Sequence, residues 1–269
     1  MPEILTDYSK PKLIAATHNS WNNCVFKLFA VYPRAECHVT PPYTLLNSGL
    51  NIAMFNRVMK TNLAPEEADQ TINDIKQVFD SKSLPFTWQV DPEDKPSDLA
   101  ERLEKAGFKR NETPGMAVKI VELVEPVKPS GFRYEKVESP EKLVAYARLL
   151  VRAYGLPEFV WDWLAGCLTH LGVVEDFQHY IGYLDDTPVA TSSILYGDGV
   201  AGLYNVATLT EFRGKGVGSL ISYVPFIDAL ELGYKIGILH SSRMGYSVYR
   251  RLGFEEICKL VRYQWNPRG

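Results

Sequence analysis

The stretch that decides the fold is TLTEFRGKGVGSL, residues 208–220, where Arg213 is followed by three glycines that alternate with Lys215 and Val217. Apolar residues precede the stretch, and a helix-like apolar pattern follows it. Glycine has no Cβ, so successive backbone N–H groups can converge there without obstruction by side chains. The N-terminus of the following helix adds partial positive charge. The stretch therefore predicts a strand, an anion-binding turn and a helix.

The spacing of the glycines separates three kinds of phosphate site. A P-loop requires Ser or Thr after its Gly-Lys pair, but Gly216 follows Gly214-Lys215. A dinucleotide-binding turn requires G-x-G-x-x-G after the first strand of its unit, whereas these glycines are spaced G-x-G-x-G and lie late in the chain. The third pattern, R-x-x-G-x-G, is matched by Arg213, Gly216 and Gly218. It suits a pyrophosphate, and a glycine-rich turn without a ligand is the alternative.

The bulk composition is that of an ordinary globular protein. Of the 269 residues, 46% are hydrophobic and 23% are charged, which suits one large domain or two of modest size. The net charge of −3 gives no general attraction to nucleic acid or anionic lipid, so we expect neither as a partner. The opening MPEILTDYSK lacks a signal-peptide pattern, and no long uninterrupted apolar window is present. We expect a cytoplasmic protein without a membrane segment.

The cysteines point to the same compartment. Cys24, Cys37, Cys167 and Cys258 lie far apart and show no paired spacing. This arrangement disfavours both a disulfide framework and a zinc knuckle. Free thiols in a reducing compartment and no bound metal are the expectation.

A linker divides the sequence into halves of similar size. The stretch VEPVKPSG, residues 124–131, contains two prolines, a serine and a glycine. The expected division is one domain over residues 1–124, a linker over 125–131 and a second domain over 132–269.

The second half alternates strand and helix patterns in the order β-α-α-β-β-β-α-β-α-β. Pro140 and Pro157 open its first two helices, and glycine ends several of the helices. An Asp-Asp-Thr turn joins two strands in a hairpin. Hairpins mixed with crossover helices indicate a mixed α/β sheet with helices on both faces. The expected strands are 132–137, 177–186, 187–199, 200–209, 234–242 and 255–265, and the expected helices are 140–155, 157–172, 217–233 and 247–254.

The first half repeats the later part of this order. Strand patterns at 51–59, 85–90 and 116–123 alternate with helix patterns at 65–79 and 97–108. The helix endings LEKAGF and YRRLGF match in kind, which favours an internal duplication. Chance similarity is the alternative, because glycine ends many helices.

Two motifs resemble those of the GNAT superfamily of acyl-CoA-dependent N-acetyltransferases. The run YNVATLTEFRGKGVGSLI is similar to the family's pyrophosphate-binding motif, and VYRRLGF is similar to its downstream helix, in which a tyrosine precedes a Gly-Phe pair by four residues. The resemblance covers residues 132–265 and implies a mostly antiparallel sheet flanked by helices. The first half resembles a degenerate second copy, as in tandem-domain members.

The resemblance implies a reaction and a set of site residues. An amine attacks the thioester of acetyl-CoA directly, a backbone N–H near Val206 stabilises the oxyanion, and Tyr249 donates a proton to the leaving thiolate. Tyr246, three residues earlier, is the rival proton donor, and a core aromatic without a catalytic role is the other alternative for Tyr249. The expected coenzyme A contacts are Val206, Ala207, Thr208, Arg213, Gly214, Lys215, Gly216, Val217, Gly218, Ser219 and Ser242.

The sequence departs from the family pattern at two places. Ser242 stands where the family often has an asparagine that contacts the pantetheine arm. The segment before the loop, AGLYNVATL, contains no acidic residue where many members carry a glutamate, so the general base is not assigned. A water relay, Tyr204 or a residue of another strand remains open, and His179 and His240 are candidates by residue type alone.

The acceptor side is less clearly marked. Trp161 lies off the apolar stripe of the second helix and, with Tyr204, is a candidate contact for the acceptor amine. The alternative is a purely structural role, in which the aromatic residues of this helix pack in the hydrophobic core and the nearby acidic residues face the solvent.

The first half lacks the cofactor motif. Its helix start TNLAPEEAD contains no glycine and carries acids where an anion would bind, and Leu103 stands at the position of Tyr249. The predicted function is acetyl transfer to the primary amine of a small molecule or peptide by the second half. The alternatives are a non-catalytic acyl-CoA-binding protein, or an N-acyltransferase that uses a longer acyl-CoA with an amino-acid acceptor.

Overall fold

The computed structural model describes residues 3–267, and the chain forms two compact units. Unit 1 contains the N-terminal segment up to Val31 together with Pro114–Cys258. Unit 2 contains Tyr32–Thr113 together with the segment from Lys259 onward. Each unit therefore combines stretches from both halves of the sequence. No helix within the described residues is long and apolar enough to cross a membrane.

The predicted division at residues 125–131 does not coincide with these units. One of the three breaks follows Val31, and the other two fall inside two long strands, β5 (Lys109–Lys119) and β11 (Glu255–Trp265). In unit 1, the second part of β5 pairs antiparallel with β10 (Ile236–His240). In unit 2, the second part of β11 pairs antiparallel with β4 (Phe86–Val90). Strand β5, at the end of the first half of the sequence, thus completes the sheet of unit 1, and β11, at the end of the second half, completes the sheet of unit 2. A strand pattern in the sequence does not reveal this exchange.

Unit 1 contains a mixed sheet in which the order of neighbouring strands is β5-β10-β9-β8-β7-β6. Its pairs are antiparallel except for the parallel pair of β9 and β10. The further elements of this unit are α1 (Lys10–Phe29), β6 (Phe132–Lys136), α4 (Pro140–Tyr154), α5 (Phe159–Leu171), β7 (Phe177–Leu184), β8 (Thr187–Gly197), β9 (Val200–Thr208), α6 (Val217–Glu231) and α7 (Tyr246–Arg251), with short 3-10 turns at Ile120–Glu122 and Thr210–Phe212.

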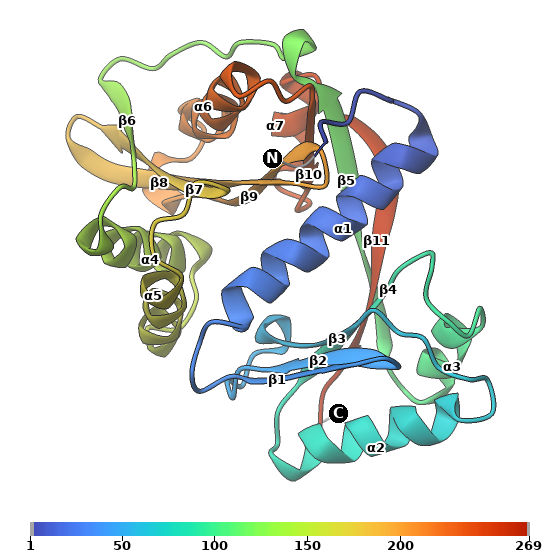
Figure 1. Cartoon of the computed structure of the whole chain (residues 1–269). Helices are drawn as coiled ribbons and strands as arrows, with labels where there is room; N and C mark the ends of the chain where they lie inside the picture. Colours follow the sequence, from blue (N-terminus) through green and yellow to red (C-terminus); the bar gives the residue numbers. More distant parts are fainter. Residues whose placement is uncertain (1–2, 268–269) are drawn as a thin grey trace. The chain divides into compact units, whose positions relative to one another are not determined.

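Helices cover both faces of the unit 1 sheet, as the sequence predicts. Helix α6 packs on β8 and β9 from one side, and α4 packs on the same strands from the other, with α5 beside it (Figure 1). The Ser139 hydroxyl accepts the N–H of Lys142 and so caps α4, and Gly155 ends this helix with φ 65°. The hairpin of β7 and β8 turns at Asp185 and Asp186, both in the left-handed region.

Helix α1 was not predicted from the sequence, and it belongs to unit 1. Its buried face carries polar side chains as well as apolar ones, which weakens the amphipathic pattern. It packs against β8, β9 and α5. The aromatic ring of Trp21 contacts the rings of Tyr204 and His240, with centroid distances of 5.8 and 5.0 Å.

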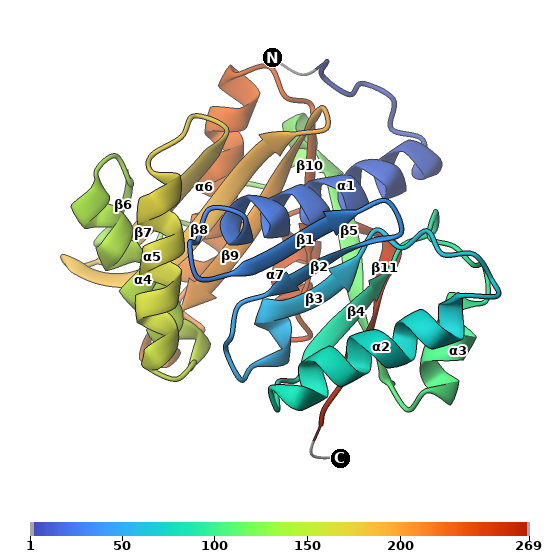
Figure 2. The same ribbon diagram turned by 60° about the horizontal axis from the view of Figure 1, so that its bottom comes forward.

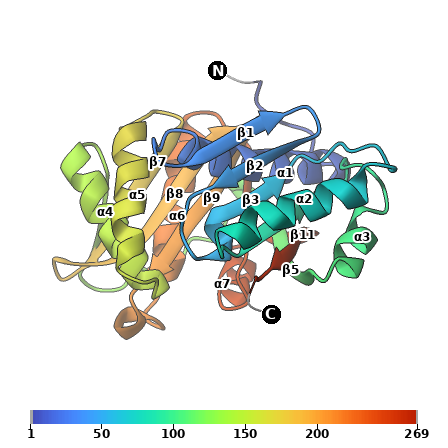
Figure 3. The same cartoon turned by 90° about the horizontal axis from the view of Figure 1, so that it is seen from below.

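Unit 2 contains strands in the order β1-β2-β3-β4-β11. Two helices cover one face of these strands (Figures 2 and 3). The parallel pair of β3 and β4 is joined by a helix, as is the parallel pair of β9 and β10 in unit 1. The further elements of this unit are β1 (Glu36–Thr40), β2 (Tyr43–Asn47), a 3-10 turn at Ala53–Phe55, β3 (Asn56–Met59), α2 (Ala68–Ser81) and α3 (Leu99–Lys105).

The helix start of unit 2 that corresponds to the glycine loop carries acidic residues. Helix α2 has Glu67 at its N-cap and Asp69 in its first turn, and neither side chain caps the helix. Leu103, at the position that corresponds to Tyr249, is fully buried in the core of this unit. An acidic helix start disfavours an anion.

Candidate functional site

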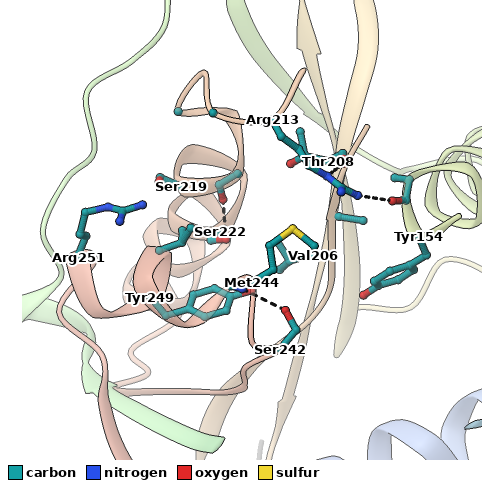
Figure 4. Close-up of a pocket in the computed structure, with 17 residues that line it drawn as sticks. Tyr154, Val206, Thr208, Arg213, Ser219, Ser222, Ser242, Met244, Tyr249 and Arg251 are labelled. Carbon is teal, nitrogen blue, oxygen red and sulfur yellow. Dashed lines mark hydrogen bonds between the residues drawn. The ribbon is translucent and has the colours of Figure 1, made fainter. Parts of the chain in front are cut away.

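A cavity of about 360 Å³ lies in unit 1 between the end of β9, the glycine loop and helix α7 (Figure 4). It brings together residues from four separate stretches of the chain, 153–154, 206–208, 213–222 and 242–251. Most of the residues predicted from the sequence line it. These are Val206, Ala207, Thr208, Arg213, Gly214, Gly216, Gly218, Ser219, Ser242 and Tyr249.

The cavity lies where β9 and β10 separate. Strand β10 pairs with β9 only as far as Leu203, whereas β9 continues to Thr208. On its other edge, β9 pairs with β8 through an irregularity, because Tyr204 faces Ser193 and Ala207 faces Thr191. Two residues of β9 therefore stand opposite one residue of β8, which is a β-bulge. The second of the two is Val206, which lines the cavity.

The glycine loop forms the anion-binding geometry that the sequence predicts. Gly214 and Gly216 have φ of 77° and 80°, a region that glycine enters without steric penalty. Gly216 is the N-cap of α6 and lines the cavity together with Gly218 and Ser219, so the start of this helix lies at the cavity. A Cβ on Gly218 would lie 3.4 Å from the Thr208 hydroxyl, tighter than most such contacts. These residues fit a phosphate group held by backbone N–H groups.

Two loop residues expected to bind the cofactor do not line the cavity. The side chain of Val217 is 1% exposed and belongs to the hydrophobic core. The Lys215 ammonium lies over the ring of Phe212, with 5.0 Å between the nitrogen and the ring centroid. Lys215 and Val217 alternate with the glycines that line the cavity, and their side chains point away from it.

Arg213 lines the cavity, but its guanidinium is bonded to backbone carbonyls. Nε donates to the Thr208 carbonyl at 3.0 Å, and Nη2 donates to the Ala153 carbonyl at 3.1 Å (Figure 4). One side chain thus joins the end of β9, the loop and the end of α4. The Arg213 side chain therefore braces the loop from the wall of the cavity.

Tyr249 is the single tyrosine of α7 that reaches the cavity. Its side chain is 8% exposed, and burial raises the pKa of its phenol to about 12, while a hydrogen bond with Ser222 opposes this shift. Ser222 itself donates to the Gly218 carbonyl at 2.7 Å. Tyr246, the rival donor in the sequence, packs against the core and is outside the lining.

Ser242 has a local structural role in addition to its place at the cavity. Its hydroxyl accepts the N–H of Gly245 at 3.1 Å, and its carbonyl accepts the N–H groups of Gly245 and Tyr246. These bonds form the turn from which α7 begins. Gly245 is required there, because a Cβ at this position would lie 2.9 Å from Cε2 of Tyr249.

The other candidates from the sequence lie outside the cavity lining. The ring of Trp161 stacks under the guanidinium of Arg148, at 4.4 Å. The Tyr204 hydroxyl is hydrogen-bonded to Ser20 of α1 at 2.8 Å. His179 is buried beside Ser193, and His240 lies in the aromatic cluster with Trp21.

Several lining residues were not among those predicted for the site. Some could have been inferred from helical spacing, since Ser222 is four residues after Gly218 and Gly245 is four residues before Tyr249. The residues at the end of α4 carry no signal in the sequence, because only the folded chain brings α4 beside the loop. The added lining residues are Ala153, Tyr154, Ser222, Met244, Gly245, Val248 and Arg251.

The lining offers hydrogen-bonding groups and positive charge, but no carboxylate or imidazole among the described residues. No Asp, Glu or His is among the lining residues in the described part of the chain. Between residues 3 and 267, no group of three or more His, Cys, Asp or Glu side chains is arranged to hold a metal ion. The cavity therefore offers backbone N–H groups, serine and threonine hydroxyls, the phenols of Tyr154 and Tyr249, and the guanidinium groups of Arg213 and Arg251.

Comparison with known proteins finds similarity at the level of structure. No family model and no curated protein matches the sequence. A GCN5-related N-acetyltransferase from Kribbella flavida is 22% identical, with a TM-score of 0.67, and the match covers 94% of this chain and 96% of that one. One from Sphaerobacter thermophilus is 17% identical, with a TM-score of 0.60 and coverage of 84% and 76%.

A tandem-domain structure matches as well. The tandem GNAT protein from the clavulanic acid biosynthesis pathway is 15% identical, with a TM-score of 0.57, and the match covers 84% of this chain and 78% of that one. These matches extend over both halves of the sequence, with the mixed, mostly antiparallel sheet and its flanking helices. The chain therefore has the fold of the GCN5-related N-acetyltransferases.

Proposed function

We propose that the chain is an acyl-CoA-dependent N-acyltransferase that transfers an acetyl group from acetyl-CoA to a primary amine. One observation carries the proposal: the glycine loop, the free end of β9 and the Tyr249 phenol line the same cavity. Acetyl-CoA would supply the activated thioester. The acceptor is a small molecule or a peptide with a free amine.

Each part of the cavity has a role in this reaction. The N–H groups at the start of α6, freed by Gly214 and Gly216, hold the pyrophosphate. The backbone N–H of Val206 donates to the carbonyl oxygen of the thioester as negative charge develops there. Tyr249 donates to the sulfur that leaves. The amine loses one proton and the sulfur gains one, so no net acid or base is consumed.

The raised pKa of Tyr249 defines how it acts. A phenol with a pKa of about 12 is a weaker acid than a thiol, whose pKa is about 8.5. Complete transfer of its proton to a free thiolate is therefore unfavourable by about 5 kcal/mol. We assign Tyr249 as a hydrogen-bond donor that stabilises the developing charge on sulfur, with the proton from the amine restoring neutrality.

The cavity supplies no general base. Since Asp, Glu and His are missing from its lining in the described residues, the amine must arrive neutral or lose its proton through water. The same feature favours the second candidate function, a non-catalytic protein that binds acyl-CoA. A longer acyl chain with an amino-acid acceptor is a variant of the first.

A binding measurement and a turnover measurement separate these functions. Titration calorimetry should detect acetyl-CoA binding, and a thiol-release assay over a panel of amines should detect turnover. Replacing acetyl-CoA with longer acyl-CoA thioesters in the same assay identifies the preferred chain. Binding without thiol release for any amine supports the non-catalytic protein, and failure to bind acetyl-CoA contradicts both proposals.

The Tyr249→Phe variant tests the role of the phenol. It should lower kcat about 100-fold or more, because loss of a preorganised hydrogen-bond donor to developing charge costs about this much, while acetyl-CoA affinity stays near that of the wild type. Tyr246→Phe is the matched control, since it removes a neighbouring phenol outside the lining and should leave kcat unchanged. Equal effects of the two substitutions would refute the assignment.

A further inference from the structure

The β-bulge in β9 places a residue in an unfavourable backbone conformation directly before Val206. Asn205 has φ 53°, in the left-handed region that non-glycine residues rarely adopt. Such a conformation persists only where the surrounding structure holds it. The bulge interrupts the ladder with β8, and β10 no longer pairs with β9 beyond Leu203, so the backbone at Val206 is left for a ligand.

Asn205 is held through both of its polar ends. Its carboxamide donates from Nδ2 to the Ser193 hydroxyl at 3.2 Å. Its backbone carbonyl accepts the Thr191 hydroxyl at 2.9 Å. Ser193 and Thr191 lie on β8, on either side of Ser192, which faces the bulge. The strand opposite the bulge therefore fixes its geometry.

Ser193 is fixed in turn by two buried side chains from other elements. Its hydroxyl oxygen lies 2.5 Å from the Tyr146 hydroxyl of α4 and 2.8 Å from Nδ1 of His179 on β7. Tyr146, His179 and Ser193 are all nearly or fully buried. With one hydrogen and two lone pairs, the Ser193 hydroxyl can satisfy all three neighbours when it accepts from Asn205, accepts from one of the other two and donates to the third.

The network keeps one charge state over the physiological range. Burial lowers the pKa of His179 to about 3, so its imidazole stays neutral there. The hydrogen bonds at Ser193 consequently do not rearrange with pH, and the bulge has one fixed support.

We propose that Asn205 and Ser193 are positioning residues, which hold the bulge so that the backbone N–H of Val206 meets the carbonyl oxygen of the acyl group. This inference rests on the proposed function, since it supplies the geometry for that reaction. A displacement of about 1 Å at a reacting group can change the rate about 100-fold. A small relaxation of the bulge is therefore sufficient to slow the chemical step.

The variants Ser193→Ala and Asn205→Gly each remove the hydrogen bond between these two side chains, and Ser193→Ala also removes the contacts with Tyr146 and His179. Glycine adopts φ 53° without a steric penalty. Asn205→Gly therefore leaves the backbone conformation of the bulge possible and removes the carboxamide that bonds to Ser193. Each should lower kcat by about 10- to 100-fold, while KM for acetyl-CoA and its dissociation constant change less than about twofold, because the phosphate loop is untouched. The double variant should lose less than the product of the two single losses, because the two side chains share a hydrogen bond within one network.

Ser192→Ala is the matched control. Ser192 lies on the same strand and is equally buried, and its hydroxyl has no hydrogen-bond partner among the described residues. Its kcat should equal that of the wild type. If Ser193→Ala behaves like Ser192→Ala, or if its loss appears in KM rather than kcat, the positioning role is refuted.

A second measurement is independent of turnover. In the free protein, the backbone amide resonance of Val206 should shift in Ser193→Ala and Asn205→Gly and stay in place in Ser192→Ala. An unchanged resonance in all three variants overturns the inference even if the enzyme is active. If the wild type releases no thiol with any amine, the proposed function fails, and the amide resonance still decides whether Ser193 holds the bulge.

Discussion

At the scale of single residues, two phenols line the cavity, those of Tyr154 and Tyr249, and Tyr249 is the buried one to which we assign a role in the reaction. Tyr249 keeps its proton well above neutral pH, because burial raises its pKa to about 12. The protonated phenol is the active form. The contribution of Tyr249 to the rate is therefore complete at pH values below its pKa and is lost only as the pH rises through that pKa. Any ionisation seen between pH 6 and pH 10 then belongs to the acceptor.

The dependence of rate on pH should therefore follow the amine. For a given acceptor, kcat/KM should rise tenfold per pH unit and level off at the pKa of that amine, because only the neutral form attacks. Two acceptors of different pKa should give profiles displaced by the difference between their pKa values. A profile with the same midpoint for both amines would reveal a general base in the protein and contradict the assignment.

Gly245 controls the position of the Tyr249 ring. A Cβ there would lie 2.9 Å from the ring, a distance that requires movement. Gly245→Ala should displace the phenol and lower kcat by about 10-fold or more. Gly197→Ala is the control, because no atom lies within 4 Å of its Cβ position. Steady-state kinetics with folding checked by circular dichroism would test this, and an unchanged kcat in Gly245→Ala would contradict it.

At the scale of elements, the sequence predicts most of unit 1. The strand pattern over 255–265 and the helix begun by Pro140 agree with β11 and α4, because period and capping are local properties. Helix α1 has buried polar residues among its apolar ones and escaped prediction. The spacing of the glycines predicts the position of the loop. The hydrogen-bond partners of Arg213 could not be predicted, because one of them lies at the end of α4, which only the folded chain brings near the loop.

The brace formed by Arg213 leads to a prediction about stability. Arg213→Ala removes two hydrogen bonds to carbonyls of separate elements, which should lower the free energy of unfolding by about 1–2 kcal/mol. The melting temperature of the free protein should fall by about 2–5 °C, and acetyl-CoA should bind more weakly.

The same substitution separates a brace from a direct phosphate contact. A residue that only contacts phosphate would change affinity without changing the melting temperature of the free protein. Arg133→Ala is the control, because it removes an exposed arginine paired with Asp186 on another edge of unit 1, and exposed pairs contribute little. Differential scanning calorimetry of the two ligand-free variants measures the melting temperatures that distinguish these roles.

At the scale of the whole molecule, the chain passes between the units three times, once after Val31 and twice within the strands β5 and β11. The five residues of β10 pair with residues 115–119, from the first half of the sequence. Residues 86–90 of β4 pair with 261–265, from the end of the second half. The predicted linker was placed correctly as an irregular segment, but strand patterns specify register and facing, not the partner across the sheet. The sequence therefore could not predict which strands each unit contains.

The exchange of strands predicts how the protein responds to a cut in the linker. With a protease site inserted after Glu125, the nicked protein should elute as one species in gel filtration and still bind acetyl-CoA, because each unit already contains strands from both pieces. Residues 132–269 expressed alone should lack a cooperative thermal transition, since β10 is left without its β5 partner. The uncut insertion protein is the control for the added site. Separation of the pieces after cleavage, or full acetyl-CoA affinity of 132–269 alone, would show that the two halves of the sequence fold independently. Either result would contradict the pairing of β10 with β5 and of β4 with β11.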